Sequence, residues 1–173
     1  MSIGKEFLAS SIKRLKYYKE LGDKTFEQLN EDDLNFQPNE ESNSIAIIIQ
    51  HMAGNMLSRW TDFLTTDGEK EWRKRDTEFE KRDLSRGHLI AFWEEGWSCL
   101  LHALEGLNED DLLKTIFIRK EGLLVVDAIN RQLAHYPYHV GQIIYIGKII
   151  KGNSWKNLSI GKGASAEFNK GMK

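Results

Sequence analysis

Two histidines four residues apart, His135 and His139, have the spacing in this sequence best suited to metal chemistry. Residues four apart on a helix lie on one face, with Cβ atoms roughly 5–6 Å apart. From there, two imidazole nitrogens can reach one ion at about 2.0–2.1 Å each. A catalytic zinc site takes three protein ligands, and His51, between Ile49 and Met52 in a largely apolar segment, is the candidate for the third. Three histidines would leave at least one coordination position for water or a substrate.

The spacing alone leaves a structural alternative open. Histidines four apart also arise by chance, and a single buried histidine is usually a hydrogen-bonded core residue. His88 and His102 are fourteen residues apart with no second ligand paired to either, and we interpret them as half-exposed surface residues. Cys99, the only cysteine, is interpreted as a packing residue because no activating neighbour is evident.

Polar side chains share the predicted helical faces of these histidines. They are Asn55, Arg59, Asp62, Arg131 and Gln142. In a functional interpretation, Asn55, Arg59 and Gln142 orient the ligands or bind the polar end of a substrate. Alternatively, the arginines and Asp62 form salt bridges at one end of the bundle, which is the interpretation we favour for those three.

Two kinds of chemistry are open to an ion held in this way. It could lower the pKa of bound water and support hydrolysis, or hold a substrate thiol as the nucleophilic thiolate. Zinc peptidases with an H-E-x-x-H motif carry a glutamate beside the first histidine, whereas Tyr136, Pro137 and Tyr138 fill the gap here. The missing base excludes that motif and modestly favours thiol activation.

Apolar residues at three- and four-residue steps predict four long helices. They are Ser2–Gln28, Ile45–Leu64 with Ser44 as its N-cap, a third from Asp83 or Ser85 to about Leu104, and about Asp127–Lys151. The polar segment Asn30–Asn43 is predicted to be a connection, and Thr115–Val126, which alternates around Glu121-Gly122, a small β-hairpin. The sequence therefore predicts an all-α four-helix bundle over residues 1–152, followed by a tail, 153–173, that packs on the bundle or is partly disordered.

Pro137 leaves two geometries open for the last helix. Inside a helix it removes the hydrogen bond to the carbonyl of Leu133. Either the helix kinks between the two histidines, which we favour, or it begins near Pro137 and leaves His135 outside it.

Two further patterns have alternative interpretations. The stretch Leu29–Leu34 (LNEDDL) recurs as Leu107–Leu112, either by chance or because a helical hairpin is duplicated. The mixed-charge segment Glu69–Asp83 is either a solvated loop or a lid whose Arg73 and Arg75 meet an anionic substrate.

The composition excludes several classes of protein. A net charge of −2 gives no basic surplus for nucleic acid or an anionic membrane. The longest apolar runs are too short to span a bilayer, and the first ten residues lack the apolar core of a signal peptide. A single cysteine allows no internal disulfide, so we expect a cytoplasmic protein.

The chain resembles the DinB/YfiT-like superfamily through His135-Tyr-Pro-Tyr-His139-Val-Gly-Gln and the earlier His51-Met-Ala-Gly-Asn. The stretch Ser58–Phe63 through Trp72-Arg73 resembles one uncharacterised bacterial branch of that group. The resemblance implies a four-helix bundle, commonly dimeric, with a zinc or nickel ion on His51, His135 and His139. Some members are metal-dependent transferases that use low-molecular-weight thiols.

The leading hypothesis is therefore a metal-dependent enzyme, a small-thiol S-transferase with a hydrolase as its rival. Two others stay open: a non-catalytic metal-binding or stress-associated bundle, and a helical module that binds partners through a dimer surface.

Overall fold

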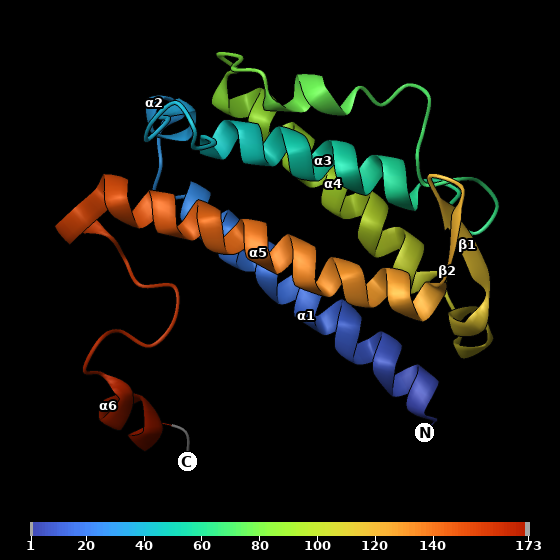
Figure 1. Ribbon diagram of the computed structural model, residues 1–173. Coiled ribbons are helices and arrows are strands. Elements are labelled where there is room, and N and C mark those ends of the chain that lie inside the picture. Colours follow the sequence, from blue (N-terminus) through green and yellow to red (C-terminus); the bar gives the residue numbers. More distant parts are fainter. Residues whose placement is uncertain (1, 172–173) are drawn as a thin grey trace.

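The computed structural model describes residues 2–171, which are mostly helical with one two-stranded antiparallel sheet (Figure 1). Four long helices pack together as a bundle: α1 (Ile3–Phe26), α3 (Ile45–Trp60), α4 (Arg86–Glu105) and α5 (Val125–Lys151). The shorter elements are α2 (Glu31–Asn35), the 3-10 helices η1 (Arg75–Phe79), η2 (Glu109–Leu113) and η3 (Gly152–Ser154), β1 (Thr115–Ile118), β2 (Glu121–Leu124) and α6 (Ser165–Lys170). None of the helices in this range combines the length and apolar character that a membrane span needs.

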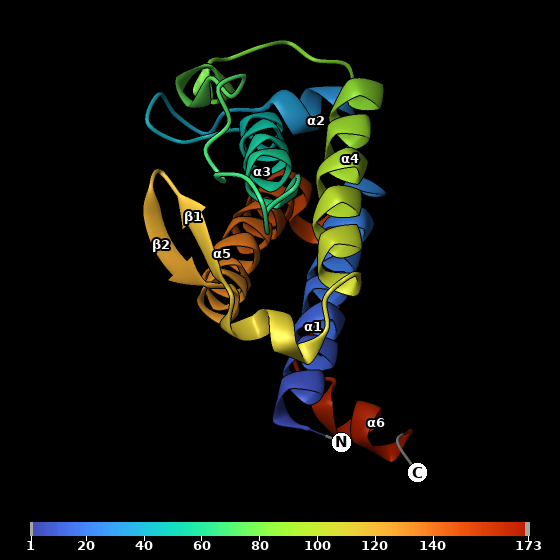
Figure 2. The same cartoon turned by 90° about the vertical axis from the view of Figure 1, so that its right-hand side faces the viewer.

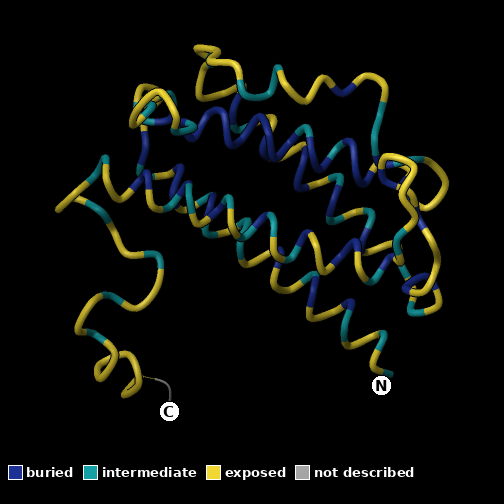
Figure 3. Tube along the Cα trace, viewed as in Figure 1, coloured by how far each residue is buried: buried dark blue, intermediate teal, exposed yellow. Residues whose placement is uncertain are grey.

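Helix α3 is the most buried of the long helices (Figure 3). It packs against α4 and α5, and the 3-10 helix η1 lies along it. Large aromatic side chains fill the space between the helices: Phe26, Trp93, Trp97 and Tyr136 are each at most 2% exposed and contact one another edge to face. Burying side chains of this size stabilises the fold by roughly 1.5–3 kcal/mol each.

Serine caps define where three of the long helices begin. The hydroxyls of Ser2, Ser44 and Ser85 accept hydrogen bonds from backbone amides three residues later, which confirms Ser44 and Ser85 as the N-caps. Helix α3 ends at Trp60, four residues before the predicted Leu64, because Asp62 adopts a left-handed backbone (φ 48°) that no helix continues through.

The β-hairpin lies where the sequence predicts it, but its turn is elsewhere. Arg119 and Lys120, both with positive φ, form the turn, whereas Glu121 and Gly122 belong to β2 and pair with Ile118 and Phe117. Asp67 explains the shift, because its carboxylate accepts the backbone amides of Arg119 (2.9 Å) and Lys120 (2.8 Å). A carboxylate from a distant loop thus stabilises a turn of two non-glycine residues.

The two LNEDDL copies form similar capped turns, and the first lies in the segment Asn30–Asn43, predicted above to be a connection. In the first copy, Asn30 and Asp33 make a reciprocal capping box that starts the short helix α2. In the second copy, Asn108 and Asp111 make the same box, but a 3-10 helix follows.

The start of the tail packs on the bundle. The backbone of Lys156 exchanges two hydrogen bonds with the side chain of Gln28, and the Trp155 ring lies against Gly147. Beyond this point the chain is mostly exposed, and α6 projects away from the long helices (Figures 1 and 2).

Close contact between α3 and α4 depends on Gly96. A Cβ built at this position would lie 2.9 Å from the Cα of Ala53. We expect Gly96→Ala to lower the free energy of unfolding by about 1–3 kcal/mol, as measured by urea denaturation, because the helices must separate. Gly141→Ala is the matched control: nothing lies near that Cβ, so helix propensity should stabilise the protein by roughly 0.5–1 kcal/mol.

Candidate metal centre

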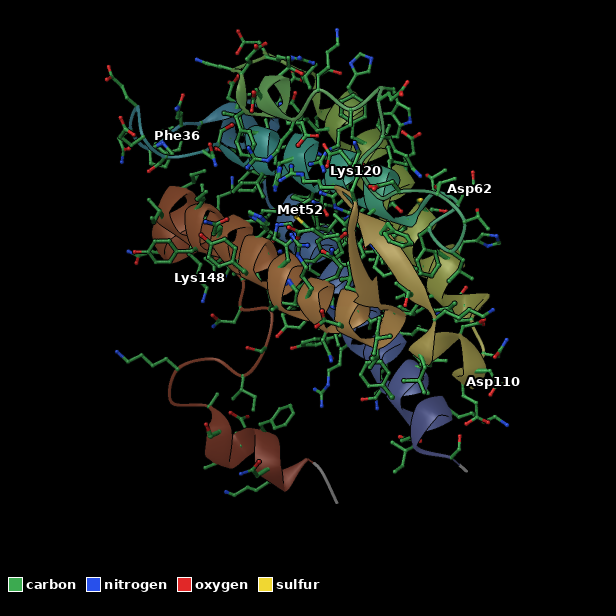
Figure 4. All side chains as sticks on the ribbon, turned by 45° about the vertical axis from the view of Figure 1, so that its right-hand side comes forward. Phe36, Met52, Asp62, Asp110, Lys120 and Lys148 are labelled. Carbon is green, nitrogen blue, oxygen red and sulfur yellow. The ribbon has the colours of Figure 1, made fainter. Side chains whose placement is uncertain are left out.

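Three histidines from two helices converge on one point of the interior. One ring nitrogen each from His51 on α3 and from His135 and His139 on α5 lie within 4.8 Å of one another. The Nε2 atoms of His135 and His139 are 3.1 Å apart, and the His51 ring centroid is 5.6 Å and 5.0 Å from theirs. Met52, next to His51, marks this region between α3 and α5 (Figure 4).

Both α5 histidines lie well inside one continuous helix. Helix α5 begins at Val125, two residues before the predicted Asp127, and Pro137 lies within it. The alternative in which the helix starts near Pro137 and leaves His135 outside is therefore wrong. The four-residue spacing places the two rings on one face, as expected.

Each imidazole has an oxygen acceptor at Nδ1. Glu78 Oε2 lies 3.0 Å from Nδ1 of His51, Gln132 Oε1 3.2 Å from that of His135, and Gln142 Oε1 2.8 Å from that of His139. An oxygen acceptor requires a proton on the nitrogen that faces it, so in the neutral form of each ring Nδ1 is the donor. The Nε2 atoms therefore carry the lone pairs.

The contact between His135 and His139 brings two of these lone pairs together. Neither Nε2 has a proton to share across the 3.1 Å gap while its Nδ1 donates to a glutamine. Two nitrogen ligands of one tetrahedral zinc ion, each at about 2.0–2.1 Å, lie roughly 3.3 Å apart. The separation of the His135 and His139 Nε2 atoms therefore fits two ligands of one divalent ion, and the ring nitrogen of His51 lies within 4.8 Å of both.

Burial keeps the α5 rings neutral. It is the largest cause that lowers the pKa of His135 to about 3, followed by the charges of His139, His51, Arg131 and Arg73. Burial likewise lowers the pKa of His139, with a smaller opposing effect from Gln142. A ligand imidazole must be neutral, so this environment favours metal coordination near neutral pH.

Glu78 links the site to the connection between α3 and α4. Its carboxylate accepts two hydrogen bonds from Arg73, from Nε at 2.7 Å and from Nη2 at 2.9 Å, in addition to the one from His51. Burial by itself raises the pKa of Glu78, but the hydrogen bonds from Arg73 and His51 outweigh it and lower the pKa. Gly54 makes this approach possible, since a Cβ there would overlap Oε1 of Glu78.

The same connection covers the His51 ring. Phe79 packs on it with ring centroids 4.8 Å apart, and the guanidinium of Arg75 lies over the Phe79 ring, 5.0 Å from its centroid. Helix η1 and the β-hairpin lie on the same side of the bundle, flanking α3 and α5 (Figure 2). Residues 75–79 are thus part of the wall of the site.

The polar residues singled out from the sequence have different positions. Gln142 contacts His139 directly. Asn55 is one step removed, because it accepts a hydrogen bond from the hydroxyl of Tyr136, beside His135. Arg59 instead donates to the carbonyl of Gly68 and forms an ion pair with Glu69. This agrees with the favoured expectation that Arg59 forms a salt bridge.

Asp62 and Arg131 form no ion pair among residues 2–171, so the salt bridges expected for them are absent there. Asp62 is exposed in the turn after α3. Arg131 is exposed on α5, where its charge contributes to the lowered pKa of His135 after burial and the other two histidines.

Sequence reasoning missed Gln132 and Glu78. Gln132 precedes His135 by three residues, as Gln142 follows His139 by three, and this symmetry was the available signal. Glu78 carries no such signal, because it lies 27 residues from His51 in a charged connection whose path the sequence does not reveal.

The remaining histidines and the cysteine lie outside the cluster. His88 caps the start of α4 with Ser85, and His102 and Cys99 line a hollow of about 550 Å³ between the end of α3 and α4. Burial raises the pKa of the Cys99 thiol. That hollow includes none of the three clustered histidines, so we do not assign the chemistry to it.

Comparisons with known proteins concern the whole fold. Residues 2–164 match the model of a family described as "Protein of unknown function (DUF1572)". A solved structure described as "Crystal structure of the conserved protein of locus from Enterococcus faecalis" is similar with a TM-score of 0.65 and 15% identity, over 88% of this chain and 99% of that one. At that identity the likeness shows the fold alone. The comparison with curated proteins gave no match.

The buried hydroxyl of Tyr136 supports the wall behind His135. It accepts from Nε1 of Trp60 (3.1 Å) and donates to Asn55 (3.0 Å). Tyr136→Phe should lower the free energy of unfolding by about 1–3 kcal/mol in urea, because two buried polar groups lose their partner. Tyr138→Phe, at a side chain 61% exposed, should change it by less than about 0.5 kcal/mol. Equal effects of the two changes would contradict this assignment.

Proposed function

Because the chain belongs to the DUF1572 family, whose description gives no activity, we propose its function from its own residues: His51, His135 and His139 bind one divalent ion, zinc or nickel, in a metal-dependent enzyme of DinB/YfiT-like type. The observation that carries the proposal is the pair of facing Nε2 lone pairs of His135 and His139, 3.1 Å apart. Without a cation this contact is repulsive, and with one it becomes a chelate.

The hydrogen bonds that the three histidines make through Nδ1 also support a metal centre. Histidine ligands commonly donate the other ring N–H to a carboxylate or a carbonyl oxygen, which fixes the tautomer and the ring orientation. Glu78, Gln132 and Gln142 provide such an acceptor for each of the three histidines. A histidine cluster serving only to pack the core would not need one ring nitrogen from each of the three histidines to lie within 4.8 Å of the others.

Of the possible reactions, we favour transfer of a small thiol. A bound divalent ion would supply Lewis acidity, which lowers the pKa of a thiol or a water that reaches it. Glu78 is the carboxylate hydrogen-bonded to the cluster, and both of its oxygens are already engaged by Arg73 and His51. It is therefore poorly placed to act as the base that hydrolysis needs, whereas a thiol can lose its proton to solvent.

The proposed transfer needs no oxidant or reductant. The substrate thiol releases its proton to solvent, and its sulfur forms a bond to an electrophilic carbon. The leaving group departs with the electron pair of the bond that breaks. We further propose that the enzyme works in the cytoplasm, where small thiols are reduced, and that it is a homodimer, as the resemblance implies.

Metal content tests the site directly. Untagged wild-type protein should carry about one zinc or nickel ion per chain by elemental analysis. His51→Ala and His139→Ala should each lose most of it, because two histidines remain where three are needed. His102→Ala, which removes an exposed histidine on α4, should keep the wild-type content. An unchanged content in both site variants would remove the metal proposal.

Turnover tests the reaction separately. Zinc- or nickel-loaded protein is mixed with glutathione, bacillithiol or 2-mercaptoethanol and 1-chloro-2,4-dinitrobenzene, and the absorbance of the thioether is followed as chloride leaves. We expect at least one thiol to react faster than without protein, with chelation or His139→Ala reducing the enzymatic rate at least about tenfold. If metal binds but no thiol is turned over, the bundle is a non-catalytic metal-binding protein and the transferase proposal fails.

A further inference from the structure

The connection between α3 and α4 has very few polar contacts with the helices. Its residues 71–83 include the 3-10 helix η1, which has no buried residue. Among residues 2–171, the hydrogen bond between Nδ1 of His51 and Oε2 of Glu78, at 3.0 Å, is the only one that joins this segment to a residue outside 70–84. Its other hydrogen bonds and ion pairs are local. The connection is therefore fastened to the bundle at a candidate metal ligand.

An aromatic contact falls on the same histidine. The Phe79 ring packs on the His51 ring, with centroids 4.8 Å apart. The two arginines that a lid would present to an anionic substrate both have partners inside the connection, since Arg73 donates to Glu78 and Arg75 lies over the Phe79 ring. The placement of the connection on α3 thus depends on the orientation of the His51 ring.

Both ends of the segment are fixed without the histidines. Before it, the carboxylate of Asp67 accepts the backbone amides of Arg119 and Lys120 in the hairpin turn. After it, Nδ2 of Asn35 donates to the carbonyl of Leu84, at 3.1 Å. Residues 71–83 can therefore move away from α3 while both ends stay in place. Local openings of this kind cost less free energy than global unfolding.

The closed position contains one unfavourable feature, at Arg73. Its side chain is only 2% exposed, and its Nη1 is buried without a hydrogen-bond partner among residues 2–171. A buried charged donor that lacks an acceptor raises the free energy of the closed form, and opening would let water hydrate it. Closure is therefore sensitive to the strength of the hydrogen bond between His51 and Glu78.

We propose that metal binding and closure of residues 71–83 against α3 are coupled through Glu78. This inference rests on the proposed metal-dependent function and adds a regulation of that site. Coordination at the other ring nitrogen of His51 fixes the ring and makes its Nδ1–H a stronger donor to the carboxylate. Coupling between two equilibria is reciprocal, so a connection that strengthens metal binding is itself held closed by the metal.

Limited digestion with trypsin tests the coupling, because the segment contains exposed cleavage sites at Lys74, Arg75, Lys81 and Arg82. Cleavage reports the population of the open form when opening and closing are fast. Relative to metal-free protein, saturating zinc should slow the first cuts in residues 71–83, located by mass spectrometry, by about 5- to 150-fold. Cleavage after Lys162, exposed in the tail, should not change, which controls for an effect of zinc on trypsin.

Glu78→Gln should remove the coupling. Three donors face the two oxygens of Glu78, namely Nε and Nη2 of Arg73 and Nδ1 of His51, so a glutamine must turn its NH2 group toward one of them. The zinc effect on cleavage should fall below about threefold, and the Kd for zinc, measured against a chromophoric chelator, should rise about 10- to 100-fold. The matched control, Glu80→Gln at an exposed site of the same connection, should keep both wild-type values.

Glu78→Asp replaces Glu78→Gln if circular dichroism melting shows that the latter fails to fold. Aspartate keeps a negative charge beside Arg73 but is too short to reach His51 as well, so it should also lose the zinc effect. If zinc binds wild type without slowing cleavage of the connection, or if a folded Glu78 variant keeps the full zinc effect, the coupling is overturned and the metal site stands. Wild-type protein that holds no zinc overturns the proposed function, and the coupling with it.

Discussion

Three imidazoles whose ring nitrogens lie within 4.8 Å of one another at a partly buried site set the main constraint on this fold. Such an arrangement is stable only if every ring is neutral and every Nδ1 proton has a fixed acceptor. The acceptors come from separate places: Gln132 and Gln142 from the helix that holds two of the rings, and Glu78 from a connection far along the chain. Helix α5 supplies most of the site by itself, whereas His51 depends on tertiary structure.

The connection between α3 and α4 is consequently a structural part of the site. Arg73 neutralises Glu78, so that a carboxylate can be buried beside His51 as one member of an ion pair. Removing either partner would leave an uncompensated charge in a poorly solvated region. Gly54 lets the carboxylate approach α3, and Asp67 ties the start of the same connection to the β-hairpin turn. The charged composition of this segment therefore reflects specific buried contacts as well as solvation.

Much of the architecture was predictable from the sequence, because the long helices and their serine caps are local features. The periodic apolar residues and Ser44 and Ser85 identify the helices, and the spacing of His135 and His139 identifies half of the cluster. What could not be predicted depends on contacts between distant segments. The hairpin turn follows from Asp67, and the orientation of His51 follows from Glu78, and neither residue is marked by any local pattern.

The two LNEDDL turns show how unequal the halves of the molecule are around this centre. Each turn is capped by the same pair of residue types, and each precedes a helix that carries histidine. After the first turn the chain enters α3 and contributes one ring, whose acceptor must come from elsewhere. After the second it passes through the hairpin into α5 and contributes two rings with acceptors on the same helix. The pairing of His135 with His139 is therefore fixed by α5 itself. The third ring comes from the packing of α3 against α5, and its Nδ1 acceptor comes from the connection that carries Glu78 and Arg73.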